Sequence, residues 1–456
     1  MSQKLQQGQT VELEITDLNT SGEGVGRSEG RVVFVPNTVT GDRLKTKIVQ
    51  SKAKFARGRI EQLLTSSPHR IRPQCIVADK CGGCQWQHIE PAFQRDAKRQ
   101  QIIQALQRIG GFEDLVVQPM LHSSDSLNYR NKSTYPLGRS ATGQVQAGYY
   151  RQGSHKIVNL NQCPVQDERL HSLLKDVKQD IQSQGWSIYN EATHQGKLRH
   201  LSLRIGINTG EMLLTLVTTN ASLLGIEAQA QIWLDRYPGL VGVCLNINSD
   251  RTNAILGQKT CTVLGKSYFR EIFAGVELHI AADTFFQVNT KAAELLFQSI
   301  VEQLNLSGDE IAIDAYCGVG TFSLPLAKKI KEVIGIEISA ASVEQAEQNA
   351  ALNQTNNVTF YSGKVKEYLT QLDFVPDIFL LDPPRKGCIP EVIETLLHLK
   401  PSSIVYVSCK PSTLARDIQL LCRSGIYQPI YIQPADFFPQ TNHVECYVIL
   451  KRTRLR

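Results

Sequence analysis

The sequence predicts a multidomain α/β protein with a small N-terminal β-barrel, an α+β central domain and a C-terminal doubly wound, mostly parallel sheet. Three observations predict this class. Apolar and polar residues alternate between glycines over 8–62, a cysteine-rich loop covers 73–90, and strand and helix patterns alternate from about residue 283 onward. We therefore expect three domains, which span 1–65, 66–265 and 266–456.

Length and composition exclude two broad classes of protein. A chain of 456 residues has room for about two to four domains. With 42% hydrophobic and 20% charged residues it can bury a core, which excludes a disordered chain. No apolar stretch approaches the roughly 20 residues of a membrane span, and the N-terminus lacks an apolar signal core. We expect a cytoplasmic monomer without a membrane partner.

The basic residues are unevenly distributed. The net charge is only +6, but nine Lys or Arg residues and one acid, Glu61, lie between Arg43 and Arg72. A basic surface on a small domain is typical of nucleic-acid binding, and an ordinary solvated face would have the same composition. The residues expected to decorate the barrel are Lys45, Lys47, Lys52, Lys54, Arg57 and Arg59.

The middle of the chain mixes helix and strand patterns. Residues 91–110 place apolar side chains on one helical face before Gly110-Gly111, and this helix is a candidate to pack on the C-terminal domain. Residues 198–205 alternate like a half-exposed strand, and 212–217 and 240–243 are less regular apolar runs. We expect an α+β domain with two antiparallel strand sets.

Five short apolar runs predict the strands of the C-terminal sheet. They lie at 311–314, 333–337, 358–361, 378–382 and 403–408, and helical segments separate them. Ligands of such sheets bind beyond the carboxyl ends of the strands. Reactive side chains of such a domain are therefore expected at these ends.

The first two strands carry the pattern of a nucleotide-cofactor site. Asp314 ends the first strand, Gly318 and Gly320 permit a tight turn, and Glu337 ends the second strand, where it could accept hydrogen bonds from ribose hydroxyls. A dinucleotide fingerprint needs a third glycine where this chain has Ser323. The pattern favours an adenosyl cofactor without phosphate, with a plain strand–helix turn as the alternative.

Two C-terminal segments add a thiol and a carboxylate. Cys409 follows the fifth strand, and Glu445 lies in a later segment that can fold back beside it. Methylation of a pyrimidine ring carbon needs one activated cysteine and one carboxylate base. Lys410 and nearby backbone amides are expected to lower the pKa of Cys409. By residue type alone, other cysteines could serve, and Glu445 could be a solvated strand residue; the other candidates are Cys317, Cys388, Cys422 and Cys446.

Four of the eleven cysteines form a separate set. Cys75, Cys81 and Cys84 are closely spaced around Gly82-Gly83, and Cys163 precedes a proline much later in the chain. In a cytosolic protein such a cluster is more often metal-binding or catalytic than disulfide-bonded. Four thiolates suit an iron–sulfur cluster or zinc, and the spacing leaves both open.

Three motifs resemble those of the RNA uracil-C5 methyltransferases. They read Asp-Pro-Pro-Arg-Lys-Gly at 382–387, Ser-Cys-Lys-Pro-Ser-Thr-Leu-Ala-Arg-Asp at 408–417 and His-Val-Glu-Cys at 443–446, and residues 285–289 resemble the segment before the family's cofactor domain. The barrel resembles the OB-like TRAM domain, an RNA-binding module of these enzymes. The resemblance implies a Rossmann-like methyltransferase domain, with Cys409 as nucleophile and Glu445 as base.

The resemblance also implies the cofactors and the substrate. It implies S-adenosylmethionine as methyl donor, a 4Fe–4S cluster on Cys75, Cys81, Cys84 and Cys163, and 23S rRNA as a more favoured substrate than tRNA. Some members have Asn at the position of Thr321 and an amide at the position of Lys364. The implied cofactor contacts are Gln287, Tyr316, Gly318, Gly320, Thr321, Glu337, Lys364 and Asp382.

Two rival functions come from other classes. The Asp-Pro-Pro run at 382–384 also resembles the motif of enzymes that methylate base amines, but Arg385 replaces the aromatic residue of that motif. A catalytically silent RNA-binding protein with a retained cofactor fold is the second rival. The complete catalytic motifs argue against it.

Overall fold

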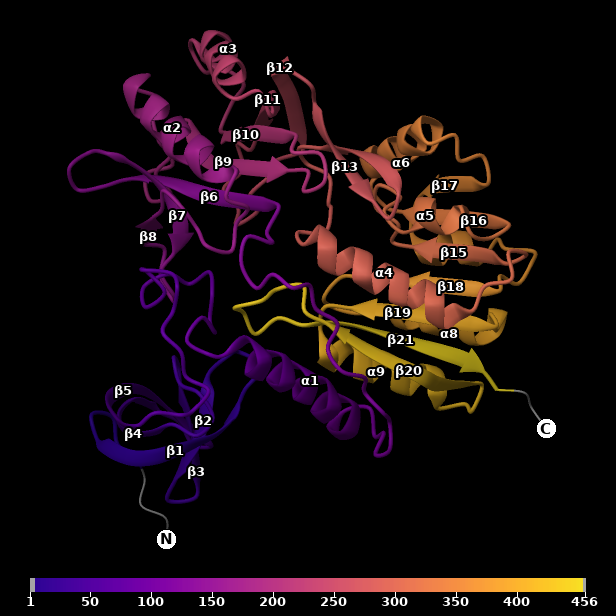
Figure 1. Ribbon diagram of the computed structural model, residues 1–456, viewed down its shortest axis with the longest axis horizontal. Coiled ribbons are helices and arrows are strands. Elements are labelled where there is room, and N and C mark those ends of the chain that lie inside the picture. The colour runs from indigo at the N-terminus through magenta and orange to yellow at the C-terminus, as the bar shows by residue number, and fades with distance from the viewer. Residues whose placement is uncertain (1–4, 454–456) are drawn as a thin grey trace.

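The computed structural model describes residues 5–453 (Figure 1). Its N-terminal part is a closed five-stranded barrel in the order β1-β2-β3-β5-β4. Buried apolar side chains such as Ile15, Val33 and Leu44 fill it, which confirms the predicted barrel. The strands are β1 (Thr10–Leu18), β2 (Gly24–Ser28), β3 (Arg31–Val35), β4 (Arg43–Ser51) and β5 (Phe55–Thr65).

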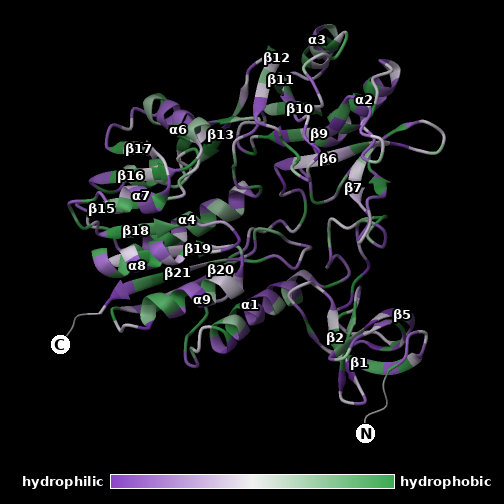
Figure 2. Cartoon of the chain, turned by 180° about the vertical axis from the view of Figure 1, so that it is seen from behind, coloured by the Kyte–Doolittle hydropathy of each residue, from purple (hydrophilic) through white to green (hydrophobic). Residues whose placement is uncertain are grey.

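Helix α1 (Pro91–Arg108) connects the barrel to the far end of the chain. It starts with Pro91, whose fixed φ suits a first helical position, and it packs on α9 (Pro411–Cys422). Lys98 Nζ donates to Asp436 Oδ1 over 2.6 Å, and both side chains are buried. Removing one partner of such a pair costs about 3–5 kcal/mol, and α1 lies beside α9 in the cartoon (Figure 2).

The central domain is built on one seven-stranded sheet in the order β12-β11-β10-β9-β6-β7-β8. The expectation of two antiparallel strand sets is wrong, because all seven strands join one sheet and β10 pairs with β11 in parallel. Helix α3 (Ile226–Arg236) provides the crossover that a parallel pair requires. The other elements are β6 (Lys132–Arg139), β7 (Val145–Tyr150), β8 (Ile157–Asn159), α2 (Leu170–Ser183), β9 (Leu198–Ile205), β10 (Met212–Thr218), β11 (Leu240–Ile247) and β12 (Lys259–Gly265).

A hairpin and a helix join the central sheet to the C-terminal sheet. The hairpin consists of β13 (Tyr268–Phe273) and β14 (Val276–Ala281), and α4 (Thr290–Leu304) follows it. The Asn289 side chain accepts from Ala292 N at the start of α4, as an N-cap does, and its amide donates to Phe437 O. Asn289 thereby ties the start of α4 to the segment that leads into the last strand.

The C-terminal sheet has the order β17-β16-β15-β18-β19-β21-β20. The first five strands pair in parallel, which confirms the doubly wound sheet, and β21 pairs antiparallel with both β19 and β20. The elements are β15 (Ile311–Ala315), α5 (Ser323–Ala327), β16 (Glu332–Glu337), α6 (Ala340–Leu352), β17 (Val358–Ser362), α7 (Val365–Leu369), β18 (Ile378–Leu381), α8 (Pro390–Leu399), β19 (Ser403–Ser408), α9, β20 (Tyr427–Ala435) and β21 (Glu445–Arg452).

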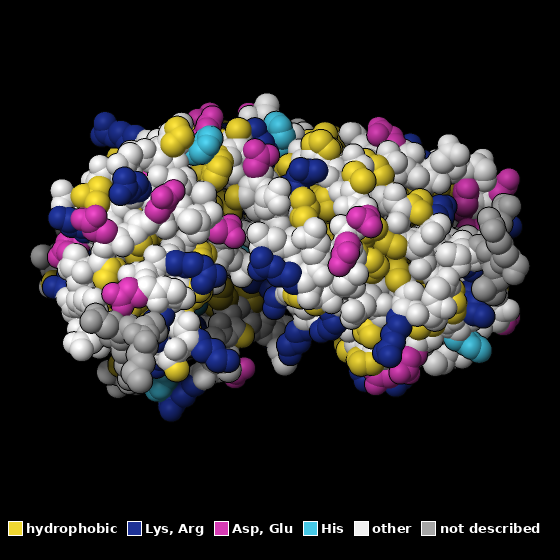
Figure 3. Space-filling view, turned by 90° about the horizontal axis from the view of Figure 1, so that it is seen from below, with side chains coloured by type: hydrophobic (Ala, Val, Ile, Leu, Met, Phe, Trp, Pro, Cys, Tyr) yellow, Lys and Arg dark blue, Asp and Glu magenta, His cyan; other side chains and the backbone are white. Residues whose placement is uncertain are grey.

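The three parts form a molecule with a hollow on its underside. Seen from below, a notch separates two lobes, and Lys and Arg side chains lie around it (Figure 3). Within residues 5–453, no helix is both long and apolar enough to span a bilayer.

Candidate active site

The carboxyl ends of the parallel strands place several predicted side chains at one edge of the C-terminal sheet. Asp314 lies near the end of β15, Glu337 ends β16, Asp382 follows β18 and Cys409 follows β19. These strands are neighbours in the sheet, so their ends meet in space although the residues are far apart in the sequence.

The turn after β15 leaves open space beside its backbone. Tyr316, Gly318 and Gly320 have φ values of 71°, 57° and 83°. This region is strained for tyrosine but not for glycine. A Cβ built at Gly318 meets no atom within 4 Å, and Gly318 N donates to Glu337 Oε2 over 3.2 Å. The turn can therefore accept a ligand close to its backbone, beside the Glu337 carboxylate.

Asp314 is buried near the end of β15 and stabilises this turn through a hydrogen bond. Ser323 Oγ donates to Asp314 Oδ2 over 2.5 Å, and burial raises the pKa of Asp314 to about 7, with a contribution from the nearby Asp382 and Glu337 carboxylates. Ser323, which replaces the third glycine of a dinucleotide site, therefore anchors the turn to the end of β15.

The pairing of β19 with β21 places the cysteine beside the glutamate. Ser408 lies opposite Cys446 in this antiparallel pair. Cys409 follows Ser408 and Glu445 precedes Cys446, so continuing the register brings Cys409 and Glu445 opposite each other. Glu445 is only 7% exposed, which excludes the interpretation of a solvated strand residue. Among the acidic groups, Glu445 contributes most to raising the pKa of Cys409.

Burial dominates the acid–base properties of the pair. Burial, and then the Glu445 and Asp382 carboxylates, raise the pKa of Cys409 to about 11, although Arg385 opposes them. The expected lowering of this pKa by Lys410 is therefore wrong, because desolvation disfavours the thiolate more than nearby donors favour it. Burial also raises the pKa of Glu445 well above its ordinary value, and that of Asp382 to about 7.

Arg385 is a site residue that sequence reasoning used only to argue against another enzyme class. Its charge favours the ionised forms of both Cys409 and Glu445. The loop that carries it is held by Asp417, whose carboxylate accepts from Cys388 N over 2.9 Å and from Tyr406 Oη over 2.6 Å. The sequence did contain a signal for this role, because the Asp-Pro-Pro-Arg motif places a cation directly after a predicted strand end.

The other candidate cysteines lie away from this position. Cys317, Cys388 and Cys446 are buried. A Cβ added to Gly335 in β16 would be 2.9 Å from Cys317 Sγ, so this thiol packs against the sheet. Cys446 belongs to the apolar core that also contains Leu414 of α9. Cys422 ends α9 and is partly buried.

The remaining predicted cofactor contacts differ in how closely they approach the turn. The backbone carbonyl of Gln287 accepts from Asn131 Nδ2 over 2.8 Å, and Phe286 packs in the core that also contains Phe322, next to Thr321. The Lys364 side chain is 67% exposed and forms an ion pair with Glu367. Lys364 thus follows the carboxyl end of β17, as a cofactor contact would, but its ammonium group forms an ion pair with a surface carboxylate.

The four clustered cysteines line one cavity of about 220 Å³. Burial raises the pKa of Cys84 to about 12, and the other three thiols each add to the shift, so all four lie near one another. Arg385 and His443 line the same cavity, so it lies next to the segment after β18 that carries Arg385. Across the described part of the chain, no three His, Cys, Asp or Glu side chains are arranged to hold a single metal ion.

Comparisons with known proteins agree with this architecture. The family model described as tRNA (Uracil-5-)-methyltransferase matches residues 257–453, and that of the TRAM domain matches residues 4–60. The chain is 59% identical to an uncharacterized RNA methyltransferase of Nostoc sp., over 97% of this chain and 96% of that one. It is 56% identical to another from Synechocystis sp., over 98% and 96% of the two chains.

One solved structure is similar over nearly the full length. The tRNA (uracil-54, C5)-methyltransferase of Pyrococcus abyssi, in complex with S-adenosyl-L-homocysteine, has a TM-score of 0.77 and 28% identity. The match covers 96% of this chain and 100% of that one. These matches show that the chain belongs to the S-adenosylmethionine-dependent RNA uracil-C5 methyltransferase family.

Proposed function

We propose that the protein methylates C5 of a specific uridine in RNA through a covalent bond between Cys409 and C6 of the base. The observation that carries the proposal is the register of β19 and β21, which sets Cys409 beside Glu445 at the cofactor edge of the sheet. Methylation of a base amine needs no thiol nucleophile, so this pair favours the ring carbon.

Each residue has one task in the proposed reaction. Cys409 loses its thiol proton to solvent, its Sγ forms a bond to C6, and the electron pair of the C5–C6 double bond moves to C5, which becomes a carbanion. S-adenosylmethionine supplies an electrophilic methyl group. Glu445 then accepts the proton from C5, the C5–C6 double bond forms again and the Sγ–C6 bond breaks. Because burial raises the pKa of Glu445, its carboxylate is a stronger base than an exposed glutamate.

Arg385 offsets part of the cost of forming a thiolate in this buried place. The pKa of Cys409 is about 11, so little thiolate exists in the free protein near neutral pH. We assign to Arg385 the stabilisation of the negative charge that forms as Cys409 reacts.

We place the cofactor beside the glycine turn. Support comes from the open space at Gly318 and from the Glu337 carboxylate, which accepts from Gly318 N and Ser339 N and still has free lone pairs for ribose hydroxyls. The other proposed contacts are Gln287, Tyr316, Gly320, Thr321, Lys364 and Asp382.

We favour 23S rRNA as the substrate, because the cysteine set resembles that of ribosomal members of the family. A tRNA substrate is the second candidate, and the Pyrococcus abyssi tRNA (uracil-54, C5)-methyltransferase supports it. The target base must leave its stack to reach Cys409, so a loop or bulge uridine is the expected target.

Mapping of 5-methyluridine in cells with and without the gene tests this function. We expect one uridine of 23S rRNA to lose its methyl group when the gene is deleted, while tRNA keeps its modification. Loss at a tRNA position alone would select the second candidate. If 5-methyluridine persists in both RNAs, and the purified protein forms no adduct with RNA containing 5-fluorouridine, methylation at C5 is wrong.

We also propose that Cys75, Cys81, Cys84 and Cys163 hold a 4Fe–4S cluster. The four thiols surround a common cavity, and a cubane cluster binds each thiolate at a separate iron, so the sulfurs do not have to converge on one point. Cation binding would also favour the thiolate forms that burial now disfavours.

The cluster would fix the junction between the three proposed domains, 1–65, 66–265 and 266–456. The loop donates from Gly82 N to Tyr150 O of the central sheet, from Trp86 Nε1 to Gly22 O of the barrel, and from Trp86 N to Gln440 O of the C-terminal part. The loop therefore contacts all three, and we assign a structural role to the cluster.

Anaerobically purified protein is expected to be brown and to contain about four irons per chain. Cys84→Ser should lose most of this iron, whereas Cys261→Ser should keep it, because Cys261 lies in β12 and does not line the cavity. Iron is measured by a chelator assay and by visible absorption. Colourless wild-type protein with stoichiometric zinc would contradict the iron cluster.

A further inference from the structure

A second, larger cavity lies on the other side of the β7–β8 pair from the cysteines. Tyr149 of β7 lines the cysteine cavity, and its neighbour Tyr150 lines the second one, since successive side chains of a strand point to opposite faces. The second cavity has a volume of about 870 Å³ and is bordered mainly by residues 136–141, 155–157 and 188–192. We call it the β7 groove.

One wall of the β7 groove carries a fixed cation over an aromatic ring. The Arg199 guanidinium lies 4.8 Å from the centre of the Tyr189 ring. Arg199 is only 8% exposed and donates to the carbonyl oxygens of Asn248 and Asp250 over 2.8 and 2.7 Å. These bonds hold the guanidinium in place, and the guanidinium in turn orients the Tyr189 ring. A ligand that stacks on this ring therefore avoids the entropic cost of ordering it.

A second oriented ring, that of Tyr150, also lines the β7 groove. The rings of Tyr150 and His155 are 5.1 Å apart, and His155 Nδ1 lies 3.1 Å from Glu191 Oε2. The Tyr150 ring is partly buried, while His155 and Glu191 are exposed. The groove is thus lined by two tyrosine rings, and each ring contacts a polar side chain, Arg199 or His155.

The charge of the β7 groove suits a polyanion. Among the described residues that line it, Arg139, Lys156 and Arg199 are basic, and Glu191 is the only Asp or Glu. Glu191 already faces His155. Aromatic rings that stack on bases, next to cations that neutralise phosphates, are the features with which proteins bind single-stranded nucleic acid.

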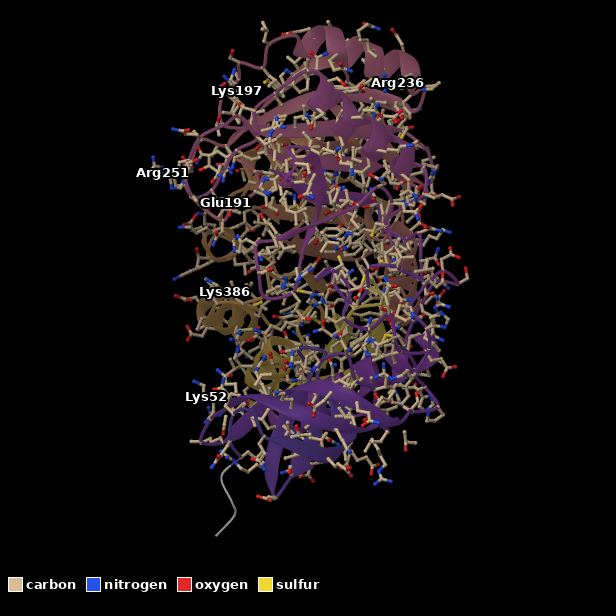
Figure 4. All side chains as sticks on the ribbon, turned by 90° about the vertical axis from the view of Figure 1, so that its left-hand side faces the viewer. Lys52, Glu191, Lys197, Arg236, Arg251 and Lys386 are labelled. Carbon is tan, nitrogen blue, oxygen red and sulfur yellow. The ribbon has the colours of Figure 1, made fainter. Side chains whose placement is uncertain are left out.

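The position of the groove relates it to the active site. Glu191, at its rim, lies on the same side of the molecule as Lys386, which follows Arg385 in the segment after β18, and as Lys52 of the barrel (Figure 4). Lys197 and Arg251 continue this line beyond Glu191. A strand that reaches the active site from the barrel can therefore continue along one side of the molecule to the groove.

We propose that the β7 groove binds an unpaired nucleotide of the RNA substrate at a distance from the target uridine. The base stacks on Tyr150, and the adjoining phosphate lies near Lys156 and Arg139. The groove adds affinity and substrate choice and takes no part in the chemistry. This proposal rests on RNA being the substrate, but not on which RNA it is.

Photo-crosslinking tests the groove directly. A short oligouridylate that contains 4-thiouridine is expected to crosslink to a wild-type peptide from residues 139–156 or 188–200, identified by mass spectrometry. Tyr150→Ala should lose this crosslink and weaken binding of the oligonucleotide about fivefold or more, as loss of one base-stacking contact does. Tyr150→Phe keeps the ring and should bind like the wild type.

A charge variant covers the case in which Tyr150→Ala fails to fold. Lys156 is exposed, so Lys156→Glu should melt like the wild type and yet bind the oligonucleotide more weakly, with a salt dependence smaller by about one unit of slope. The matched control is Lys175→Glu, because Lys175 is exposed on α2 and does not line the groove.

The outcomes separate this proposal from the proposed function. If no crosslink falls in the two segments, or if Lys156→Glu binds the oligonucleotide like Lys175→Glu, the groove is not an RNA site. Methylation of uridine by the wild-type protein is scored in a separate assay. Its absence would overturn the proposed function whatever the groove binds.

Discussion

Cys409→Ala is expected to abolish both methylation of RNA and covalent attachment of the protein to RNA. Without the thiol no bond to C6 can form, so C5 does not become a nucleophile, and Glu445 by itself cannot replace this step. Because the whole route is lost, the expected rate is the uncatalysed background. Transfer of a radioactive methyl group to RNA measures the first effect, and denaturing electrophoresis with RNA containing 5-fluorouridine measures the second.

Cys446→Ala is the matched control for this variant. Cys446 is next to Glu445 in β21, but it is buried in the core shared with α9. This variant can lose some stability, as removal of a buried side chain does, but it should keep both methylation and adduct formation. If Cys409→Ala still methylates RNA at a rate near that of the wild type, the nucleophile is another residue.

Glu445→Gln is expected to stop the reaction one step later. The amide cannot take the C5 proton, so Cys409 adds, the methyl group is transferred, and the product stays attached to the protein. Loss of a general base slows its step by about 10²–10⁴-fold, which is enough for methylated RNA to accumulate as a covalent complex without a fluorinated base. Electrophoresis of the labelled complex, followed by peptide mapping to Cys409, measures this effect.

The pKa of Cys409 gives a control that is independent of RNA. The Glu445 carboxylate contributes to raising this pKa to about 11, so replacing it with a neutral amide should lower the pKa. At a fixed pH below the pKa, each unit of lowering gives about ten times more thiolate, and iodoacetamide should label Cys409 faster in Glu445→Gln. Normal turnover of Glu445→Gln would show that another group is the base.

The sequence was sufficient for the features that depend on neighbouring residues. The period of the apolar residues predicted the barrel, α1 and the five parallel strands, because a strand or helix must turn its apolar side to the core wherever it lies. The order of Asp314, Gly318, Gly320 and Glu337 predicted a tight turn after β15 and a carboxylate at the end of β16, since strand ends and the turns after them are local features.

Only the tertiary structure decided which distant groups meet. The sequence does not say which strands β21 pairs with. Its place between β19 and β20 sets Glu445 beside Cys409. The same holds for Lys98 and Asp436, which are 338 residues apart, and for the parallel pairing of β10 with β11. Such contacts depend on how whole elements pack, and local periodicity carries no information about the partner.

The acid–base state of the site shows the same division. The residue types and the nearby Lys410 predicted a lowered pKa for Cys409, but the pKa is raised because the fold buries the thiol next to two carboxylates. Desolvation depends on everything packed around a group. The sequence therefore determined which reactive groups this protein has, and the tertiary structure determined which of them meet and in which direction burial shifts the pKa of each.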